Sequence, residues 1–566
     1  MLSRSTFPPT TAISIPAAPK FGLILRQIKS ERLPYVVIVA IFLLAGLIGH
    51  DPWKADEAYV FGMIQHLLDT GDWVVPMVAG EPFMEKPPLY YWVAAFFAKC
   101  FSGILPIHDG ARLASGFFMI VTCCALRSTV RVWWGRGIGR YAAFVLVASL
   151  GVLVQTHTMM PDLPLLSGFA MSALGFSYVL SRPVKGGIFL GLGIGIGFMS
   201  KGVLAPAVIG VTALILPVLF SEWRAASYRR GLMIALGVAS PWLLIWPIAL
   251  YHRSYELFMD WFWMNNIGRF VGFSVPILKT EHLPWFWSQT IPWYTFPALP
   301  LAMFALWQKR NTALREPAMQ YSIVSFAALM LVLAVSSSGR CIYALPLMIP
   351  LAIVASAATT KLPKRIDDVW VWSSIILFGA LSLLIWGGWA IMMATGTPPA
   401  WPFLLRYLPA SFVPEFDADD FFIAALITIG ALFALRKLWH APARGLMTWV
   451  IGITLAWSLL MTIWLPWLDF SKSYRDVFSA MPLPKQMKCV ATIGLGEGER
   501  AMLRYVTGHF PIRREINKHA DCDVLLVQGF LKEGVENVDL KGWKHVWEGA
   551  RPGDTSERFW LYIAAH

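Results

Sequence analysis

The sequence predicts an all-α polytopic membrane protein with about 13 transmembrane helices, and three observations carry this prediction. Of its 566 residues, 57% are hydrophobic and only 14% are charged, whereas a soluble domain has about 25% charged residues. Apolar runs recur along the chain, and runs of about 20 residues are long enough to cross ~30 Å of hydrocarbon. Their hydrophobicity is continuous and does not alternate, which favours helices over a transmembrane β-barrel.

The first 32 residues (1–32) show no cleavable signal pattern, so we expect them to form a short cytoplasmic tail. A transmembrane domain is then predicted over 33–468. Hydropathy places its spans over 33–49, 111–130, 139–158, 163–181, 186–199, 203–220, 231–250, 284–306, 319–336, 341–359, 369–390, 419–436 and 446–465. A further apolar run, 89–105, contains Lys99 and adjoins prolines, so hydropathy alone leaves it ambiguous.

The distribution of basic residues resolves this ambiguity. If 89–105 lies along the membrane surface, 23 Lys and Arg residues fall in the N-terminal tail and the loops of one side. Because cytoplasmic loops are enriched in Lys and Arg, this arrangement predicts a cytoplasmic N-terminus and a periplasmic C-terminus. The net charge of +13 then reflects topology, and we expect no nucleic-acid partner.

The same topology collects unusual polar residues on the periplasmic side. The first periplasmic loop, 50–110, is expected to contain juxtamembrane helices and is rich in both carboxylates and lysines. Asp162 and Lys201 fall at the outer ends of spans, and the loop 251–283 and Arg340 add further charges. Any one of these residues could equally be a solvated loop charge, but the set predicts a charged cavity that opens to the periplasm.

The last segment, 469–566, has the composition of a soluble domain and contains 14 Lys and Arg residues in its 470–566 part. The stretches CVATIG and DVLLVQGF are typical of buried strands, and GERAMLRYVTGH between them is typical of a helix. We therefore expect a small periplasmic α/β domain. Cys489 and Cys522 lie in a compartment that permits a disulfide, although two free core thiols are equally compatible with the sequence.

The chemistry of the predicted cavity points to a phosphate carried by a lipid. The sequence has no phosphate-binding loop, no HExxH motif and no Ser-His-Asp order, so a nucleotide-consuming site is unsupported. Lys86, Arg269 and Arg340 are candidate phosphate ligands. Asp56 and Glu57 directly follow the first span, which places carboxylates near the interface.

Several segments together resemble the GT-C superfamily of polyprenyl-phosphate-sugar glycosyltransferases. The resemblance is to the branch that contains the lipid A aminoarabinose transferase and bacterial relatives of protein O-mannosyltransferases, and it covers about residues 30–470. The segments are ADEAYVFGMIQHLLDTGDWVVP, GEPFMEKPPLYYW, MPDLPL, FMSKGVLAP, FWMNNIGRFVGF, HLPWFW and GRCIYALPLMIPLAI.

This resemblance implies a monomeric enzyme, surrounded by lipids of a bacterial inner membrane, with its active site facing the periplasm. It would transfer a sugar from a polyprenyl-phosphate-linked donor to a glycolipid such as lipid A. The alternatives are a protein O-glycosyltransferase and a lipid-linked-sugar transporter or flippase. A transporter is less favoured, because the sequence shows no clear internal repeat and its charges gather at one face.

The resemblance also implies roles for individual residues. Asp56 would be the principal catalytic carboxylate, with Glu57 beside it and Asp162 as the second acidic residue of the cavity. The donor phosphate would be held by Lys86, Arg269, Arg340 and Tyr343.

A divalent cation is a possible cofactor, with Glu85 and His282 as candidate ligands. The related branch often has Glu-His where this chain has Asn265-Asn266. Asparagine is a poor ligand for Zn²⁺ and suits harder ions. We therefore expect that zinc is not tightly bound.

The topology can be tested with a reporter fused after Trp560. We expect a periplasm-dependent reporter such as alkaline phosphatase to be active, because the basic loops retain the opposite side in the cytoplasm. Activity of a cytoplasm-dependent reporter at the same position would contradict the 13-span topology.

Overall fold

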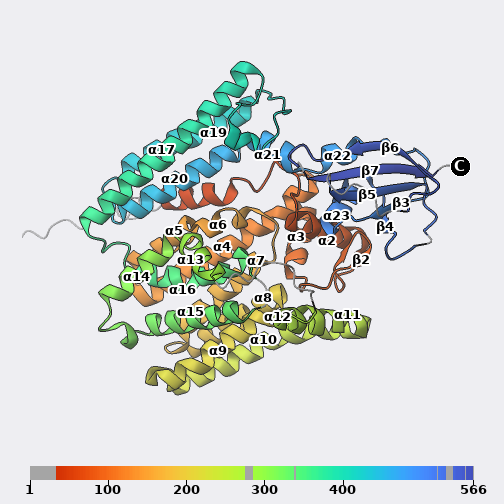
Figure 1. The fold of residues 1–566 in the computed structure, drawn as a ribbon. Coiled ribbons are helices and arrows are strands. Elements are labelled where there is room, and N and C mark those ends of the chain that lie inside the picture. Colours follow the sequence, from red (N-terminus) through yellow and green to blue (C-terminus); the bar gives the residue numbers. More distant parts are fainter. Residues whose placement is uncertain are drawn as a thin grey trace, which may run out of the picture.

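Helices form the body of the protein, and one sheet formed by the C-terminal segment lies at one end of that body (Figure 1). The computed structural model describes residues 34–274, 285–336, 339–518, 520–530, 539–554 and 556–564. The predicted tail, 1–32, and His282 lie outside these residues.

Every predicted apolar segment contains helix in the described residues. The helices are Pro34–Leu44, α4 (Ile107–Trp134), α5 (Arg136–Ala148), α6 (Leu150–Leu153), α7 (Asp162–Val179), α8 (Pro183–Lys201), α9 (Leu204–Leu219), α10 (Ala226–Arg253), α13 (Phe286–Tyr294), α14 (Ala298–Gln308), α15 (Pro317–Val335), η5 (Cys341–Leu347), α16 (Met348–Ser356), α17 (Lys364–Thr395), α19 (Ala418–Leu438), α20 (Arg444–Leu460) and α21 (Leu465–Lys472).

Several of these helices are short or bent. By length and composition, six helices within the described part of the chain can cross a membrane, or eight if each bent pair is one span. The bends are 77° between α5 and the segment Leu150–His157, and 63° between α20 and α21. The structure thus has several helices that can span a membrane, and the count of 13 remains a prediction.

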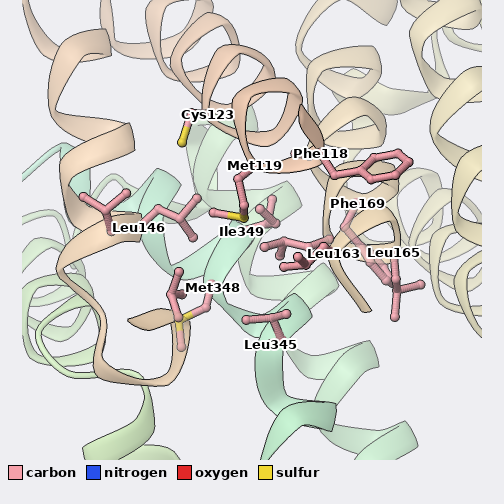
Figure 2. Close-up of a cluster of buried hydrophobic side chains, with 14 of the residues drawn as sticks. Phe118, Met119, Cys123, Leu146, Leu163, Leu165, Phe169, Leu345, Met348 and Ile349 are labelled. Atoms are coloured by element: carbon pink, nitrogen blue, oxygen red, sulfur yellow. The ribbon is translucent and has the colours of Figure 1, made fainter. Parts of the chain in front are cut away.

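A core of large apolar side chains joins α4, α5 and α7 to η5 and α16. Figure 2 shows this cluster, in which Met119, Leu146, Leu163, Leu345 and Met348 converge. All five are at most 1% exposed. Their packing fixes the ends of α7 and η5, which carry residues of the site described below.

Glycines allow α8 to approach its neighbours closely. A Cβ atom at Gly187 would lie 2.6 Å from the carbonyl oxygen of Gly231 in α10, and one at Gly186 would lie 2.5 Å from the Cα of Val179 in α7. Small residues permit such backbone contact between membrane helices, where packing and not hydrophobicity drives association. The three helices therefore form one tightly packed layer.

The first loop folds into α2 (Asp56–Thr70), a short hairpin of β1 (Met77–Val78) and β2 (Glu81–Pro82), and α3 (Leu89–Phe101). With 13 residues, α3 is about 20 Å long and thus shorter than the ~30 Å hydrocarbon core. Its buried face includes Tyr90 and Tyr91. Other predicted spans, such as Pro34–Leu44 and α14, contain equally short helices, so the surface position of 89–105 stays a prediction.

The C-terminal segment forms a mixed five-stranded sheet with the order β4-β3-β5-β7-β6. Strand β3 pairs in parallel with β4 and β5, whereas β7 is antiparallel to β5 and β6. Its elements are α22 (Arg475–Ser479), β3 (Val490–Ile493), α23 (Glu497–Thr507), β4 (Pro511–Arg513), β5 (Val524–Phe530), β6 (Trp543–Gly549) and β7 (Glu557–Ala564).

The β3, α23 and β5 elements lie where the sequence predicts them. The structure also decides the state of the two cysteines, since Cys489 and Cys522 form a disulfide. This bond links the residues that precede the two parallel strands β3 and β5.

Helix α23 rests directly on α2 (Figure 1). A Cβ atom at Gly62 of α2 would lie 2.5 Å from the Cβ of Ala501 in α23. Ion pairs surround this contact: Arg504 lies 2.5 Å from Asp69, and Arg500 lies 2.8 Å from Glu81. The C-terminal segment therefore holds the first loop in part through α23.

The contact at Gly62 can be tested by adding a side chain there. We expect Gly62→Leu to lower the apparent stability by about 1–3 kcal/mol, because an overpacked contact forces the two helices apart. Thermal unfolding of the purified protein, followed by tryptophan fluorescence, measures this effect. Gly103→Leu is the control, since a Cβ at Gly103 meets nothing within 4 Å. Equal midpoints for the two variants would contradict the close packing of α2 and α23.

Candidate functional site

A cavity of about 260 Å³ lies where the first loop meets the ends of α7, α8 and η5. Most of the site residues predicted from the sequence line it, and they are Asp56, Glu85, Lys86, Asp162, Arg269, Arg340 and Tyr343. Residues more than 280 positions apart in the sequence thus share one site. Glu57 does not line the cavity.

Asp56 is the first residue of α2, and its carboxylate forms an ion pair with Arg340. A negative charge at this position is favoured by the helix dipole. Its side chain remains 19% exposed, toward the cavity. Asp56 is therefore both oriented by a cation and accessible to a ligand.

Glu57, the next residue, is buried in a different environment. Its carboxylate lies 2.7 Å from the guanidinium of Arg112 in α4, and it accepts hydrogen bonds from the backbone N–H groups of Trp53 and Met159, both at 3.1 Å. Consecutive helix residues point about 100° apart, and here Asp56 lines the cavity whereas Glu57 points to Arg112 of α4.

The pKa of Glu57 reflects this network. Burial raises the pKa of its carboxyl group, but the charge of Arg112 and the hydrogen bonds from Arg112 and the Trp53 N–H lower it below its usual value. Glu57 is therefore an ionised carboxylate that joins α2 to α4 and to the segment before Asp162. The catalytic role of Glu57 stays a prediction, and from this network we propose that Glu57 positions α2.

Asp162 at the start of α7 is paired with Lys201 at the end of α8. The ammonium nitrogen lies 2.5 Å from the carboxylate and 4.4 Å from the centre of the Tyr343 ring. Gly202 follows with φ +64°, and a Cβ there would lie 1.9 Å from the Oδ1 atom of Asn266. The Lys-Gly turn thus places the cation inside the cavity.

Sequence reasoning placed Lys201 in the predicted charged cavity but gave it no catalytic or binding role. A signal was present, because Lys201 ends an uncharged run from Gly186 to Ser200 that is long enough to cross most of a membrane. A cation that follows such an uncharged run has few carboxylate partners except those of the predicted cavity on the same side.

Lys86 differs from the other cations of the cavity because it bonds a neutral group. Its ammonium donates a hydrogen bond to the Tyr59 hydroxyl at 3.1 Å, and burial raises the pKa of that hydroxyl to about 12. Burial lowers the pKa of Lys86, whereas Tyr59, Asp162, Tyr91 and Glu85 raise it above its ordinary value. Lys86 is therefore charged at neutral pH.

Arg269 follows η3 (Asp260–Gly268), at the start of α12 (Arg269–Val271), and lies 2.8 Å from Glu85. Burial lowers the pKa of Arg269, and the Glu85 carboxylate raises it to a net value above the ordinary one. Asn266 is used internally, since it donates to the Trp261 carbonyl at 2.8 Å and accepts from the Val203 N–H at 3.3 Å.

These contacts bear on the metal site that the resemblance implies. The Glu85 carboxylate is engaged by Arg269, and Asn266 is engaged by the backbone. Among the residues that the structure describes, no group of three or more His, Cys, Asp or Glu side chains is arranged to hold a metal ion. The described residues therefore do not fit a metal ion, and we derive no metal-dependent step.

The cavity combines a charged floor with an apolar wall. Its lining has four cations against three carboxylates, and each carboxylate pairs with a cation other than Lys86. The wall is formed by Leu329, Val332, Leu333, Ile342 and Pro346. Such a site can bind an anion whose remaining part is apolar, with Lys86 supplying an uncompensated positive charge.

Comparison with known protein families gives one match to this chain. Residues 85–246 match the family described as "Dolichyl-phosphate-mannose-protein mannosyltransferase". This segment contains the Glu85-Lys86 turn, Asp162 and Lys201.

Two similar proteins are named as undecaprenyl phosphate-alpha-4-amino-4-deoxy-L-arabinose arabinosyl transferases. The protein from Pseudomonas fluorescens (strain Pf0-1) is 26% identical over 368 residues, which are 63% of this chain and 60% of that protein. The one from Pseudomonas paraeruginosa is 26% identical over 450 residues, or 75% of this chain and 74% of the relative.

Two solved structures of one protein share the fold. ArnT from Cupriavidus metallidurans bound to undecaprenyl phosphate has a TM-score of 0.69 and 14% identity, with 94% of this chain and 98% of that chain covered. The apo state has a TM-score of 0.66 and 15% identity, with 95% and 99% covered. The solved structures show a shared fold. The predicted resemblance to polyprenyl-phosphate-sugar glycosyltransferases is confirmed by the family match together with the two named relatives.

A substitution of Glu57 can separate a positioning role from a chemical role, because only the positioning role requires a loss of folding stability. We expect Glu57→Gln to lower the apparent stability by about 3 kcal/mol, because Arg112 then loses a buried charge-assisted partner. Thermal unfolding of the purified protein measures this change.

Asp56→Asn is the matched control for this test and should melt close to the wild type, because its ion pair is partly exposed. If Glu57→Gln unfolds at the wild-type temperature but no longer transfers sugar, the result would instead indicate that Glu57 takes part in the reaction.

Proposed function

We propose that this GT-C-type glycosyltransferase moves a sugar from a polyprenyl-phosphate-linked donor to a periplasmic glycolipid such as lipid A. The observation that carries the proposal is the cavity in which Lys86, Arg269 and Arg340 lie beside an apolar wall. A lipid phosphate has matching parts, since its phosphate suits the cations and its chain suits the wall.

The proposed membrane arrangement follows from the basic loops. It has 13 spans over 33–468, a cytoplasmic tail over 1–32 and a periplasmic α/β domain over 469–566. The cavity then faces the periplasm of a bacterial inner membrane, and the enzyme acts as a monomer. In this arrangement the donor lipid enters the cavity from the outer leaflet.

In the proposed reaction, an acceptor hydroxyl attacks the anomeric carbon of the donor sugar. The new carbon–oxygen bond forms as the bond from the anomeric carbon to the lipid phosphate breaks. The hydroxyl proton passes to Asp56, and the electron pair of the broken bond leaves with the phosphate. If the acceptor group is an ionised phosphate oxygen, no proton transfer is needed.

The leaving phosphate gains negative charge during this step. Lys86 is the group best placed to stabilise that charge, because it has no carboxylate bound to it. Preorganised cations are effective at this task because they need no reorganisation as the charge develops. Arg269 and Arg340 pair with Glu85 and Asp56, while Lys201 pairs with Asp162.

The relatives support the donor class. Their printed names include undecaprenyl phosphate and the sugar 4-amino-4-deoxy-L-arabinose. The solved relative was crystallised with undecaprenyl phosphate itself. A protein acceptor is the second candidate, because the family matched over 85–246 is described as a protein mannosyltransferase.

The proposal predicts distinct kinetic effects for two cavity residues. For an acceptor that attacks through a hydroxyl, we expect Asp56→Asn to abolish transfer, because that hydroxyl loses its base. Lys86→Ala should lose a charge-assisted contact worth about 1.5–3 kcal/mol, or roughly a tenfold to hundredfold decrease in kcat/KM. The measurement is sugar transfer by the purified full chain, with varied concentrations of a polyprenyl-phosphate donor.

Lys99→Ala is the control, since Lys99 is an exposed lysine of the same loop that does not line the cavity. Assays with lipid A and with a protein acceptor in parallel identify the acceptor class. Wild-type rates in both Asp56→Asn and Lys86→Ala would overturn the proposed site. If the wild type transfers sugar neither to lipid A nor to the protein acceptor, the proposed function is overturned.

A further inference from the structure

A second concavity lies at the opposite ends of α8 and α10 from the catalytic cavity. It has a volume of about 580 Å³ and combines three cations with apolar side chains. The lining residues are Arg182, Pro183, Val184, Lys185, Ile188, Phe189 and Arg230. We refer to it as the basic groove.

The position of the basic groove relative to the membrane follows from α8. This helix begins at Pro183 in the groove and ends at Lys201 in the catalytic cavity. Its 19 residues span about 28 Å, close to the ~30 Å thickness of the hydrocarbon core. The cavity and the groove therefore lie at the two opposite interfaces of a membrane.

Figure 1 agrees with this placement. Helix α10 carries Arg230 near its first turn and leads at its other end into α11 (Tyr255–Met259), on the side of the C-terminal sheet. In the proposed orientation, the groove thus lies among the lipid headgroups of the cytoplasmic leaflet.

The charge of the groove is uncompensated. Arg182, Lys185 and Arg230 are exposed, and none of them forms an ion pair with a carboxylate of the described residues. Lys185 instead lies 4.4 Å from the ring centre of Tyr178 and 5.8 Å from that of Phe189. Like charges held together repel, so an anion that binds between them is favoured.

Glycine contacts hold the three cations close to one another. The Gly187–Gly231 approach fixes the first turns of α8 and α10 side by side, and Arg230 directly precedes Gly231. Gly186 likewise presses α8 against the end of α7. This packing fixes the backbone positions from which the three basic side chains reach the groove.

An apolar stripe leads from the cations toward the membrane interior. Val184 is 47% exposed and Ile188 is 40% exposed. Residues four apart lie on the same face of a helix, one turn apart. The stripe therefore begins beside Arg182 and Lys185 and runs along α8 in the direction of the hydrocarbon core.

We propose that the basic groove binds one anionic membrane phospholipid. The phosphate and acidic headgroup lie between Arg182, Lys185 and Arg230, and an acyl chain follows Val184 and Ile188. A free phosphate or a nucleic acid would use the cations but leave this stripe unused. A basic pocket between membrane helices at a lipid interface is suited to an acidic headgroup.

The test is native mass spectrometry of the purified full chain in mixed micelles with equal amounts of phosphatidylglycerol and phosphatidylcholine. We expect the wild type to retain phosphatidylglycerol at least about tenfold more than phosphatidylcholine. Each basic side chain near an anionic surface contributes about a fivefold factor in affinity. Arg182→Gln/Lys185→Gln/Arg230→Gln should therefore lose this preference.

The control variant is Lys361→Gln/Lys364→Gln/Arg365→Gln, which removes the same charge from an exposed cluster at the start of α17. It should keep the preference. If the triple groove variant fails to fold, Arg230→Gln alone provides the test, with about fivefold lower retention expected.

Two results would overturn the proposal. One is that the groove variant retains as much phosphatidylglycerol as the control variant does. The same result for Arg230→Gln, where that variant replaces the triple variant, would also overturn the proposal. The other is release of the bound lipid by millimolar inorganic phosphate, which would identify a simple anion site. Neither result depends on sugar transfer, so failure here is distinct from failure of the proposed function.

Discussion

The buried pair of Glu57 and Arg112 joins the parts of the molecule that must meet to make the site. One carboxylate oxygen contacts both the guanidinium of α4 and the N–H of Met159, and the other receives the N–H of Trp53. The remaining guanidinium N–H groups reach Asp109 and the carbonyl groups of residues 47, 50 and 51. Because a buried charge without partners is very costly, this network allows only one arrangement of the two segments that carry Asp56 and Asp162.

A second constraint acts within the cavity, where charges of both signs lie beside apolar residues. Each carboxylate is balanced by a cation from a different element: Asp56 by Arg340, Glu85 by Arg269 and Asp162 by Lys201. This pairing allows a strongly charged site to persist next to the hydrocarbon region. It also leaves one positive charge, that of Lys86, available to a ligand. The cavity is thus ordered before a ligand enters, and its net preference is for an anion.

Hydropathy located the helices because burial in lipid requires continuous apolar runs, and each predicted run contains helix. Charge bias grouped Asp56, Lys86, Asp162, Arg269 and Arg340 on one side, and the structure brings them to one cavity. Sequence reasoning could not separate Glu57 from Asp56, because both are acidic and adjacent, and only helix rotation against α4 distinguishes them. Local hydropathy also cannot decide the number of spans, because bends such as that between α20 and α21 divide one apolar run into two helices.

The docking of the C-terminal sheet on α2 has a consequence for the order in which the protein is completed. Glu557 in β7 pairs with Lys54, two residues before Asp56, and Arg475 binds Asp51 through both carboxylate oxygens. These partners are separated by more than 400 residues, and β7 is the last strand of the described chain. During synthesis, the helices insert into the membrane long before β7 exists. The final setting of the loop around Asp56 therefore follows the synthesis of β7, and a chain that stops before β7 would lack the Glu557 partner of Lys54.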